Sequence, residues 1–279
     1  MLDLNDFVDK AGKLFTLPDL CLQLNHLVND SASSVDEIAR LVGIDPALTI
    51  RVLKLANSAL YNHKVPVVTI PQAIQIIGTD ELNNIAISTS AALIFKGVGA
   101  KKINLQDFWE HSVFSAILAK QIFKKVTGKS HGVMFVAGLI HNIGVLVVLE
   151  RLPYFVVDLN QIIGDKRLPS EHERSTLGFS YAELGSEMVS RWNISPMLAQ
   201  IIKYQCYPFN GSAFELETVI LNVAIGIADN ILEGTGSSNC EKYIDYQILN
   251  ELEVSYQQLD SLIDQAMDVA PSITTILHG

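Results

Sequence analysis

The sequence predicts an all-α protein built from an N-terminal helical bundle and a second helical bundle that follows it. Apolar residues recur at intervals of three and four along nearly the whole chain, which is the period of an amphipathic helix. The alternation of apolar and polar residues that marks a strand is essentially missing. The chain has 279 residues, of which 49% are hydrophobic, so it can bury one large core or two moderate ones.

Capping residues predict where about a dozen helices begin. In the first half of the chain, apolar runs follow a residue that can accept from free backbone N–H groups or a proline suited to the first helical turn. The predicted starts are Leu17–Pro18, Ser34 with Glu37 as a capping box, Asp45–Pro46, Ile70–Pro71, and Thr79 as the cap of ELNNIAISTSAALIF. We expect these helices to form the N-terminal bundle.

The stretch 96–103, KGVGAKKI, is the best candidate for a linker, because glycine and charge replace the periodic pattern there. It divides the chain into an N-terminal bundle, residues 1–100, and a second region with the C-terminal helices, residues 101–279. In the second region, Asn104 and Ser195–Pro196 are predicted helix starts. Further helices are expected in VMFVAGLIHNIG, around 171–192, over roughly 214–232, and in two amphipathic C-terminal segments.

Charge and cysteine content narrow the class of protein. The formal net charge of −10 disfavours a long basic surface, so nucleic-acid binding is not expected of the chain as a whole. Cys21, Cys206 and Cys240 are widely separated and form no CxxC or Cys/His pattern. We expect reduced thiols and no disulfide framework. The N-terminal residues MLDLNDFVDKAGKLF lack the apolar block of a secretory signal, so a cytoplasmic location is predicted.

The segment 132–149, GVMFVAGLIHNIGVLVVL, is nearly long enough to span a bilayer and carries no Asp, Glu, Lys or Arg. His141 and Asn142 stand in its middle and are followed by Gly144. Polar groups are costly at the centre of a membrane, whereas two shorter helices in a large soluble core can hold them. We therefore expect two buried helices and no membrane span.

Two stretches of the first half, IDPALTIRVLKLANSALYN and TIPQAIQIIGTDELNNIAIS, resemble the front of an HDOD (HD-related output) domain, with its Asp-Pro, Asn-Ser and Ala-Ile-x-x-Ile-Gly elements. The second half adds FWEHSVFSAILAKQI, FVAGLIHNIGVLVV and YAELGSEMVSRWNISPMLAQII in the order of that family's HD-like part. The resemblance covers roughly residues 12–210. It implies that the second region is an HD-like helical bundle.

The resemblance also implies a relict form of a metal site. Related HD phosphohydrolases use histidines and aspartates from several helices to bind divalent metals, which activate water against phosphate esters. His111 matches the early histidine, His141 matches the first residue of the His-Asp doublet, and Asn142 occupies the aspartate position. The other implied pocket residues are Tyr181 and Gln205–Cys206, in place of further histidines, and Asp229, which matches the distal aspartate.

Asparagine in the doublet lacks the negative charge that retains a bare cation and assists proton transfer. At most three ligands are left, His111, His141 and Asp229, although such a set binds zinc or iron in other proteins. We therefore expect a metal-free pocket, no cofactor and no catalysis. Two ordinary alternatives stay open: the histidines and Asn142 are hydrogen-bonded core residues, and Asp229 is a solvated residue near a helix end.

The leading hypothesis is a non-catalytic module of bacterial signal transduction that binds an unidentified signalling protein or a small nucleotide-like ligand. One alternative is a metal-dependent phosphohydrolase that acts on a nucleotide or cyclic dinucleotide, with Asn142 in place of the aspartate. Another is a DNA-binding regulator, because segment 34–56 resembles a helix-turn-helix. Its second helix offers DNA mainly Thr49, Arg51 and Lys54, which is meagre for holding phosphates. The sequence does not indicate the oligomeric state.

Overall fold

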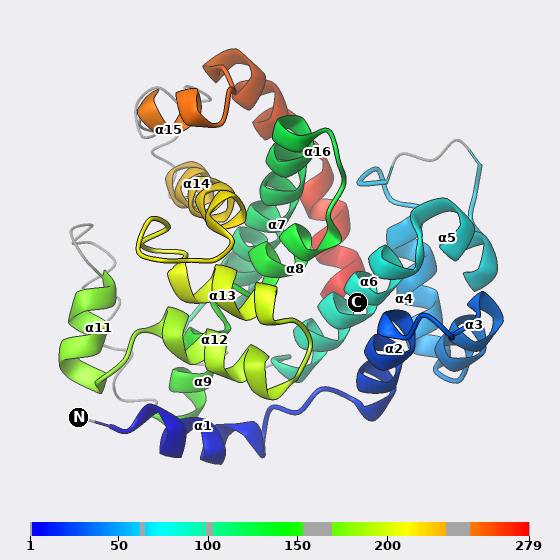
Figure 1. Ribbon diagram of the computed structural model, residues 1–279, viewed down its shortest axis with the longest axis horizontal. Helices are drawn as coiled ribbons and strands as arrows, with labels where there is room; N and C mark the ends of the chain where they lie inside the picture. The colour runs from blue at the N-terminus through cyan, green and yellow to red at the C-terminus, as the bar shows by residue number, and fades with distance from the viewer. Residues whose placement is uncertain are drawn as a thin grey trace.

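All regular structure in the described part of the chain is helical, so the predicted fold class is confirmed (Figure 1). The structure is a computed structural model that describes residues 2–61, 65–96, 98, 103–152, 169–232 and 246–278. The helices are α1 (Leu4–Gly12), α2 (Asp19–Asn29), α3 (Val35–Gly43), α4 (Pro46–Ala56), α5 (Ile70–Ile77), α6 (Thr79–Ile94), α7 (Leu105–Thr127), α8 (Gly132–Ile140), α9 (Ile143–Arg151), α11 (Pro169–Leu177), α12 (Tyr181–Arg191), α13 (Pro196–Tyr204), α14 (Glu215–Leu232), α15 (Tyr246–Glu251) and α16 (Tyr256–His278).

Helices α2 to α6 pack on one another and form the N-terminal bundle. The capping box of Ser34 and Glu37 is present at the start of α3, as predicted. The Asp45 side chain accepts hydrogen bonds from the first turn of α4, which also confirms the predicted start there. The apolar stripes of these helices meet in a common core, in which Leu24 and Val52 are fully buried.

The predicted cap at Thr79 is wrong, because Thr79 is the first residue of α6 and Gly78 is its N-cap. Gly78 has a φ of 86°, which glycine adopts without steric cost. Its N–H donates to Ile74 O at 2.8 Å and ends α5, so a single glycine closes one helix and precedes the next. The threonine that caps a helix in this region is Thr69, which forms a capping box with Gln72 at the start of α5.

The second bundle is arranged around α7, which packs against α8, α14 and α16. The predicted start is confirmed, because the Asn104 side chain accepts from Gln106 N at 3.1 Å. Gly128 ends the helix with a φ of 71°. The inner face of α7 is fully buried at Ile117 and Leu118. The predicted Ser195 cap of α13 is also present, with Leu198 N as its donor.

Helices at the two ends of the chain pack across the predicted division between residues 1–100 and 101–279. The short helix α1, which the sequence analysis did not predict, packs against α12. Leu2 N donates to Leu177 O at 2.8 Å, and the Phe7 and Phe179 ring centroids are 5.4 Å apart. At the other end, α16 packs against α7 and also against α4 and α6. The side chains of the core pack continuously across this division. The division into two domains therefore stays a prediction.

The long apolar segment forms two core helices, α8 and α9, that meet at His141–Asn142. Of the most apolar 18-residue window in Gly132–Arg151, 83% is buried inside the protein. This burial matches the expected pair of core helices. It also places the polar residues of the helix junction inside the second bundle.

Candidate functional site: a polar pocket at the junction of α8 and α9

Three of the predicted site residues lie together although they come from distant parts of the chain. His111 is in the second turn of α7, and Asp229 is near the end of α14. His111 Nε2 lies 2.7 Å from Asp229 Oδ1, and the rings of His111 and His141 are 5.4 Å apart between centroids. The His111 side chain is 17% exposed and that of Asp229 is 53% exposed, so this pair forms the solvent side of the pocket.

His141 is the buried centre of the site, with only 1% of its surface exposed. Its Nδ1 lies 2.6 Å from Gly138 O, and because a carbonyl oxygen only accepts, Nδ1 carries the proton and donates it. Nε2 is therefore the unprotonated nitrogen, and it has no hydrogen-bond partner among the described residues. Burial, together with a smaller repulsion from His111, lowers the pKa of His141 to about 3. The ring is neutral at physiological pH.

Two glycines let neighbouring helices approach the site closely. A Cβ on Gly138 would lie 2.5 Å from Ala116 N, so α8 and α7 are in backbone contact there. A Cβ on Gly144 would overlap the carbonyl oxygen of Tyr181. The first contact supports the turn that carries the Gly138 carbonyl. The second brings the start of α12, and with it Tyr181, against the first turn of α9.

Gln205 and Tyr181 contribute two more buried polar groups to the pocket. Gln205 Nε2 donates to His141 O at 2.9 Å, and Asn222 Nδ2 donates to Gln205 O at 2.7 Å. Tyr181 N donates to Glu173 Oε2 at 2.8 Å. Within the described part of the chain, Gln205 Oε1 and the Tyr181 hydroxyl are buried without a partner. Burial, and then the Glu173 carboxylate, raise the pKa of Tyr181, so its hydroxyl stays protonated.

The remaining predicted positions are more peripheral. Asn142 is the half-buried N-cap residue of α9, but its side chain does not cap the helix. Cys206 is exposed and Cys21 is buried, and neither forms a disulfide with a described residue. Cys240 lies outside the described residues.

His141 Nε2, Gln205 Oε1 and the Tyr181 hydroxyl are buried polar groups with almost no accessible surface, and none has a partner in the described region. Buried polar groups are ordinarily hydrogen-bonded, so these three are exceptions within the site. They do not form a metal centre. No group of three or more His, Cys, Asp or Glu side chains among the described residues could hold a metal ion. The residues present do not fit the one- or two-metal site of an HD phosphohydrolase.

Sequence reasoning did not single out the residues that orient this pocket. Asn222 holds the backbone of Gln205, and Glu173 accepts from Tyr181 N. The sequence does indicate a role for Asn222, because this polar residue interrupts the apolar run VILNVAIGI. It precedes Asp229 by seven residues and so lies on the same face of a helix. Glu173 had none, because its role depends on how the turn before α12 places the backbone.

The fold defines the class of protein: an all-helical, HD-like domain, in which His111, His141 and Asp229 lie together. A sequence profile of the HDOD domain matches residues 14–208. The chain belongs to the HDOD family, which is related to the HD phosphohydrolases. Asp229 lies beyond the matched residues, so its place in the site rests on the contact with His111.

Solved structures share this fold at low sequence identity. The protein named "Putative phosphohydrolase" from Shewanella amazonensis SB2B superposes with a TM-score of 0.79 at 23% identity, and 97% of each chain is covered. An HDOD domain protein with unknown function from Geobacter sulfurreducens gives a TM-score of 0.71 at 22% identity, over 98% of this chain and 99% of that one. The "Putative signal transduction protein" from Marinobacter aquaeolei VT8 gives 0.71 at 18% identity, over 99% and 66%.

A curated relative, an uncharacterized protein of Treponema pallidum (strain Nichols), is 24% identical over 200 residues. The matched region is 70% of this chain but only 38% of that protein. The chain thus spans well under half the length of this relative. The likeness supports a shared domain.

Proposed function

We propose that the chain is a non-catalytic signal-transduction module that acts by binding a partner protein or a small ligand. The observation that carries the proposal is Asn142, which stands where a phosphohydrolase needs a carboxylate. A catalytic metal must lower the pKa of bound water and neutralise phosphate charge at the same time. A neutral amide oxygen contributes to neither as a carboxylate does. The name of the Marinobacter protein fits such a role.

The hydrogen bonds of the pocket support the same proposal. His111 Nε2 is engaged by Asp229, so a metal that recruited both side chains would have to displace this contact. His141 is left as the one unprotonated imidazole nitrogen without a partner in the described pocket. A single imidazole is too small a ligand set to retain a divalent cation against water. Binding of a small polar molecule needs no such set.

Metal analysis of the purified protein, combined with a phosphodiesterase and nucleotidase screen in Mn²⁺, tests the proposal. We expect less than stoichiometric metal and no turnover above that of His141→Ala. His26→Ala, a change at an exposed histidine of the N-terminal bundle, is the matched control. Stoichiometric metal, with turnover that His141→Ala abolishes and His26→Ala keeps, would show that the protein is an enzyme.

The variant Asn142→Asp tests the physical reason directly. It restores the missing negative charge beside His141, so we expect it to bind Mn²⁺ at least about tenfold more tightly than the wild type in calorimetry. Equal affinity of the two proteins would mean that Asn142 is not what limits metal binding.

The proposal also places the protein in the cytoplasm. Cys21 and Cys206 are free, which is typical of a reducing compartment. The apolar segment that could span a membrane by length is largely buried in the protein.

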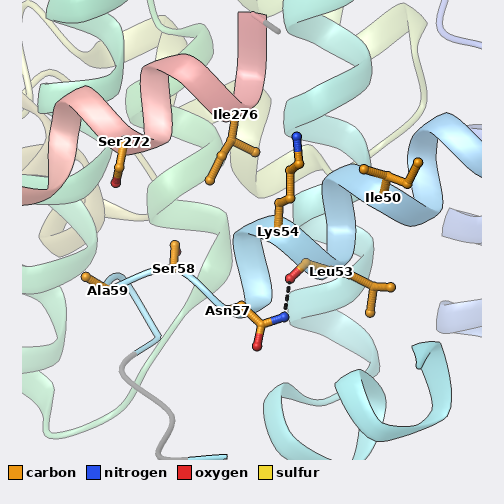
Figure 2. Close-up of a pocket in the computed structure, with 8 residues that line it drawn as sticks. All are labelled: Ile50, Leu53, Lys54, Asn57, Ser58, Ala59, Ser272 and Ile276. Atoms are coloured by element: carbon orange, nitrogen blue, oxygen red, sulfur yellow. Dashed lines mark hydrogen bonds between the residues drawn. The ribbon is translucent and has the colours of Figure 1, made fainter. Parts of the chain in front are cut away.

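DNA binding is less well supported than ligand or partner binding. Helices α3 and α4 do form a helix-turn-helix-like pair, but the hydroxyl of Thr49 is used internally, donating to Val42 O at 3.0 Å. Lys54 lies in a groove between α4 and α16, across from Ser272 and Ile276 (Figure 2). A recognition helix needs its outer face free for the major groove, and α16 covers part of this face.

A further inference from the structure

Helix α16 connects the two bundles and carries a proline, Pro271, in its interior. It packs against α7 of the second bundle and against α4 and α6 of the first (Figure 1). The side chains along its inner side are buried both before and after the proline: Leu259, Ile263, Ala266, Ile273 and Leu277. Pro271 thus divides α16 into a long first part and two final turns, residues 272–278, which we call the α16 tip.

Pro271 weakens the helix at the point where the α16 tip begins. Proline has no N–H, so the carbonyl of Met267, four residues earlier, loses its helix hydrogen bond. Pro271 is exposed and the Met267 side chain is 50% exposed, so the missing bond lies on the solvent side of the helix. Helices bend with their convex side toward solvent, and sharp bends occur at proline. Pro271 is therefore a point at which the tip can hinge.

The α16 tip also has a low intrinsic tendency to be helical. The four consecutive residues 273–276, ITTI, are β-branched and lose side-chain freedom in a helix. Three hydroxyl groups donate to carbonyls of the same helix: Ser272 to Val269, Thr274 to Ala270 and Thr275 to Pro271. Such bonds slightly destabilise a helix and often bend it. The tip therefore depends on its packing to stay helical.

This packing is apolar and incomplete. Ile273 and Leu277 are the two fully buried side chains that anchor the tip. Beside them, a groove of about 550 Å³ separates Ser272 and Ile276 from α4 (Figure 2). Ile50, on the α4 side of this groove, is 53% exposed. The tip thus covers one side of α4 without closing tightly on it.

Polar contacts fix the two bundles to each other elsewhere but not at the α16 tip. Lys120 Nζ of α7 bonds Glu81 Oε1 of α6, and these side chains are only 8% and 11% exposed. Tyr61 OH donates to the same Glu81 oxygen at 2.6 Å. Within the part of the chain that the structure describes, residues 272–277 make no ion pair or hydrogen bond to another helix. Two apolar anchors alone hold the tip in place.

We propose that the α16 tip opens at Pro271 as one unit while the rest of the protein stays folded, and that it thereby uncovers α4. Segments with few buried apolar contacts open at a lower free energy than the whole protein unfolds. Opening withdraws Ser272 and Ile276 from the groove and exposes the side of α4 that carries Leu53 and Lys54. Helix α4 lies within residues 14–208, which match the HDOD profile, whereas α16 lies outside them. The closed tip is thus an intramolecular block on one face of the matched domain.

Amide hydrogen exchange of the full chain, resolved to single residues, tests this inference. Opening as one unit predicts a common protection factor for the amides of the tip, at least about tenfold below that of residues 262–269. Simple fraying of a helix end predicts instead a protection factor that falls steadily from residue 273 to residue 278. A steady fall, or equal protection on the two sides of Pro271, would overturn the inference.

Two variants test the hinge and the anchors separately. Pro271→Ala restores the missing N–H and should raise the protection of the tip by at least about tenfold. Asp264→Ala, a change at an exposed position of the same helix, is the matched control and should leave this protection unchanged. Leu277→Ala removes one anchor and should lower the protection of every amide in the tip by the same factor.

An effect of Leu277→Ala confined to the amides next to residue 277 would show that the tip does not open as one unit. An effect of Asp264→Ala equal to that of Pro271→Ala would show that the proline is not the hinge. None of these positions lies in the α8–α9 pocket, so the metal analysis and the hydrolase screen are independent of their outcome.

Discussion

Gly144→Ala provides a stringent test of how the α8–α9 pocket is built. The added methyl group would overlap the Tyr181 carbonyl oxygen and lie 2.9 Å from its carbonyl carbon and 3.1 Å from its Cα. All three atoms belong to the backbone, so no side chain can rotate away to make room. Helices α9 and α12 would have to separate locally by about 1 Å, in a core that is packed as densely as a crystal.

The cost of this separation can be placed at about 3 kcal/mol, the upper part of the range for overpacked cores. Gly185, on the other side of the same helix contact, supplies the comparison. A Cβ there would lie 3.5 Å from Ile202 Cγ2 and 3.6 Å from Gly144 N, which are ordinary contact distances. Gly185→Ala is inside α12, where alanine is favoured over glycine by up to about 1 kcal/mol.

Thermal unfolding followed by circular dichroism measures both variants. In a protein of this size each 1 kcal/mol shifts the melting temperature by roughly 2–4 °C. Gly144→Ala should therefore melt roughly 6–12 °C below the wild type, whereas Gly185→Ala should melt at the same temperature or slightly above it. If the two variants melted together, the close backbone contact between α9 and α12 would be refuted.

Two further predictions concern buried charge. Because the pKa of His141 is lowered from 6.5 to about 3, the unfolded chain binds a proton between these values that the native protein refuses. Stability therefore falls as the pH drops through this window, by about 2 kcal/mol at pH 5. In urea unfolding at pH 7 and pH 5, His141→Gln should lose about this much of the pH dependence, and an unchanged dependence would contradict the assignment. Removing one partner of the Glu81–Lys120 pair should lower the free energy of unfolding by roughly 3–5 kcal/mol. The double variant Glu81→Gln/Lys120→Met should lower it by clearly less than the sum of the two single changes. Additive losses in this double-mutant cycle would show that the pair is not coupled.

The fold could be predicted from the sequence largely because local signals agree with the tertiary structure. Ser34 with Glu37, Asp45 and Asn104 all cap helices where the sequence places them. The sequence predicted the wrong helix start at the one junction where the backbone conformation of a neighbouring residue sets the boundary. Thr79 is an adequate cap by composition, but the positive φ of Gly78 moves the helix start by one residue.

Helix α1 was missed although it carries local signals, namely the cap of Asp3 and a buried face of Phe7, Val8 and Ala11. Its place in the fold is set by contacts with α12 and with Phe179. The Asp9–Arg191 ion pair joins it to the last residue of α12. Contacts between such distant residues leave no mark that a single sequence can display.

The candidate site divides in the same way. The set of His111, His141 and Asp229 follows from the family resemblance, and the structure brings the three together. The protonation state of His141 could not be predicted, because it depends on the Gly138 carbonyl and on complete burial. The buried ion pair of Glu81 and Lys120 could not be predicted either, because its two residues are 39 positions apart in the chain.

The hydrogen bond from His141 to the Gly138 carbonyl has a consequence for how a signal could reach the pocket. Histidine usually makes a protein responsive to acidity near neutral pH. This ring is instead locked in one tautomer and stays uncharged throughout the range of a living cytoplasm. A signal that acts through His141 must therefore change the contacts of the ring with its neighbours, since the charge of the ring itself does not change over this range.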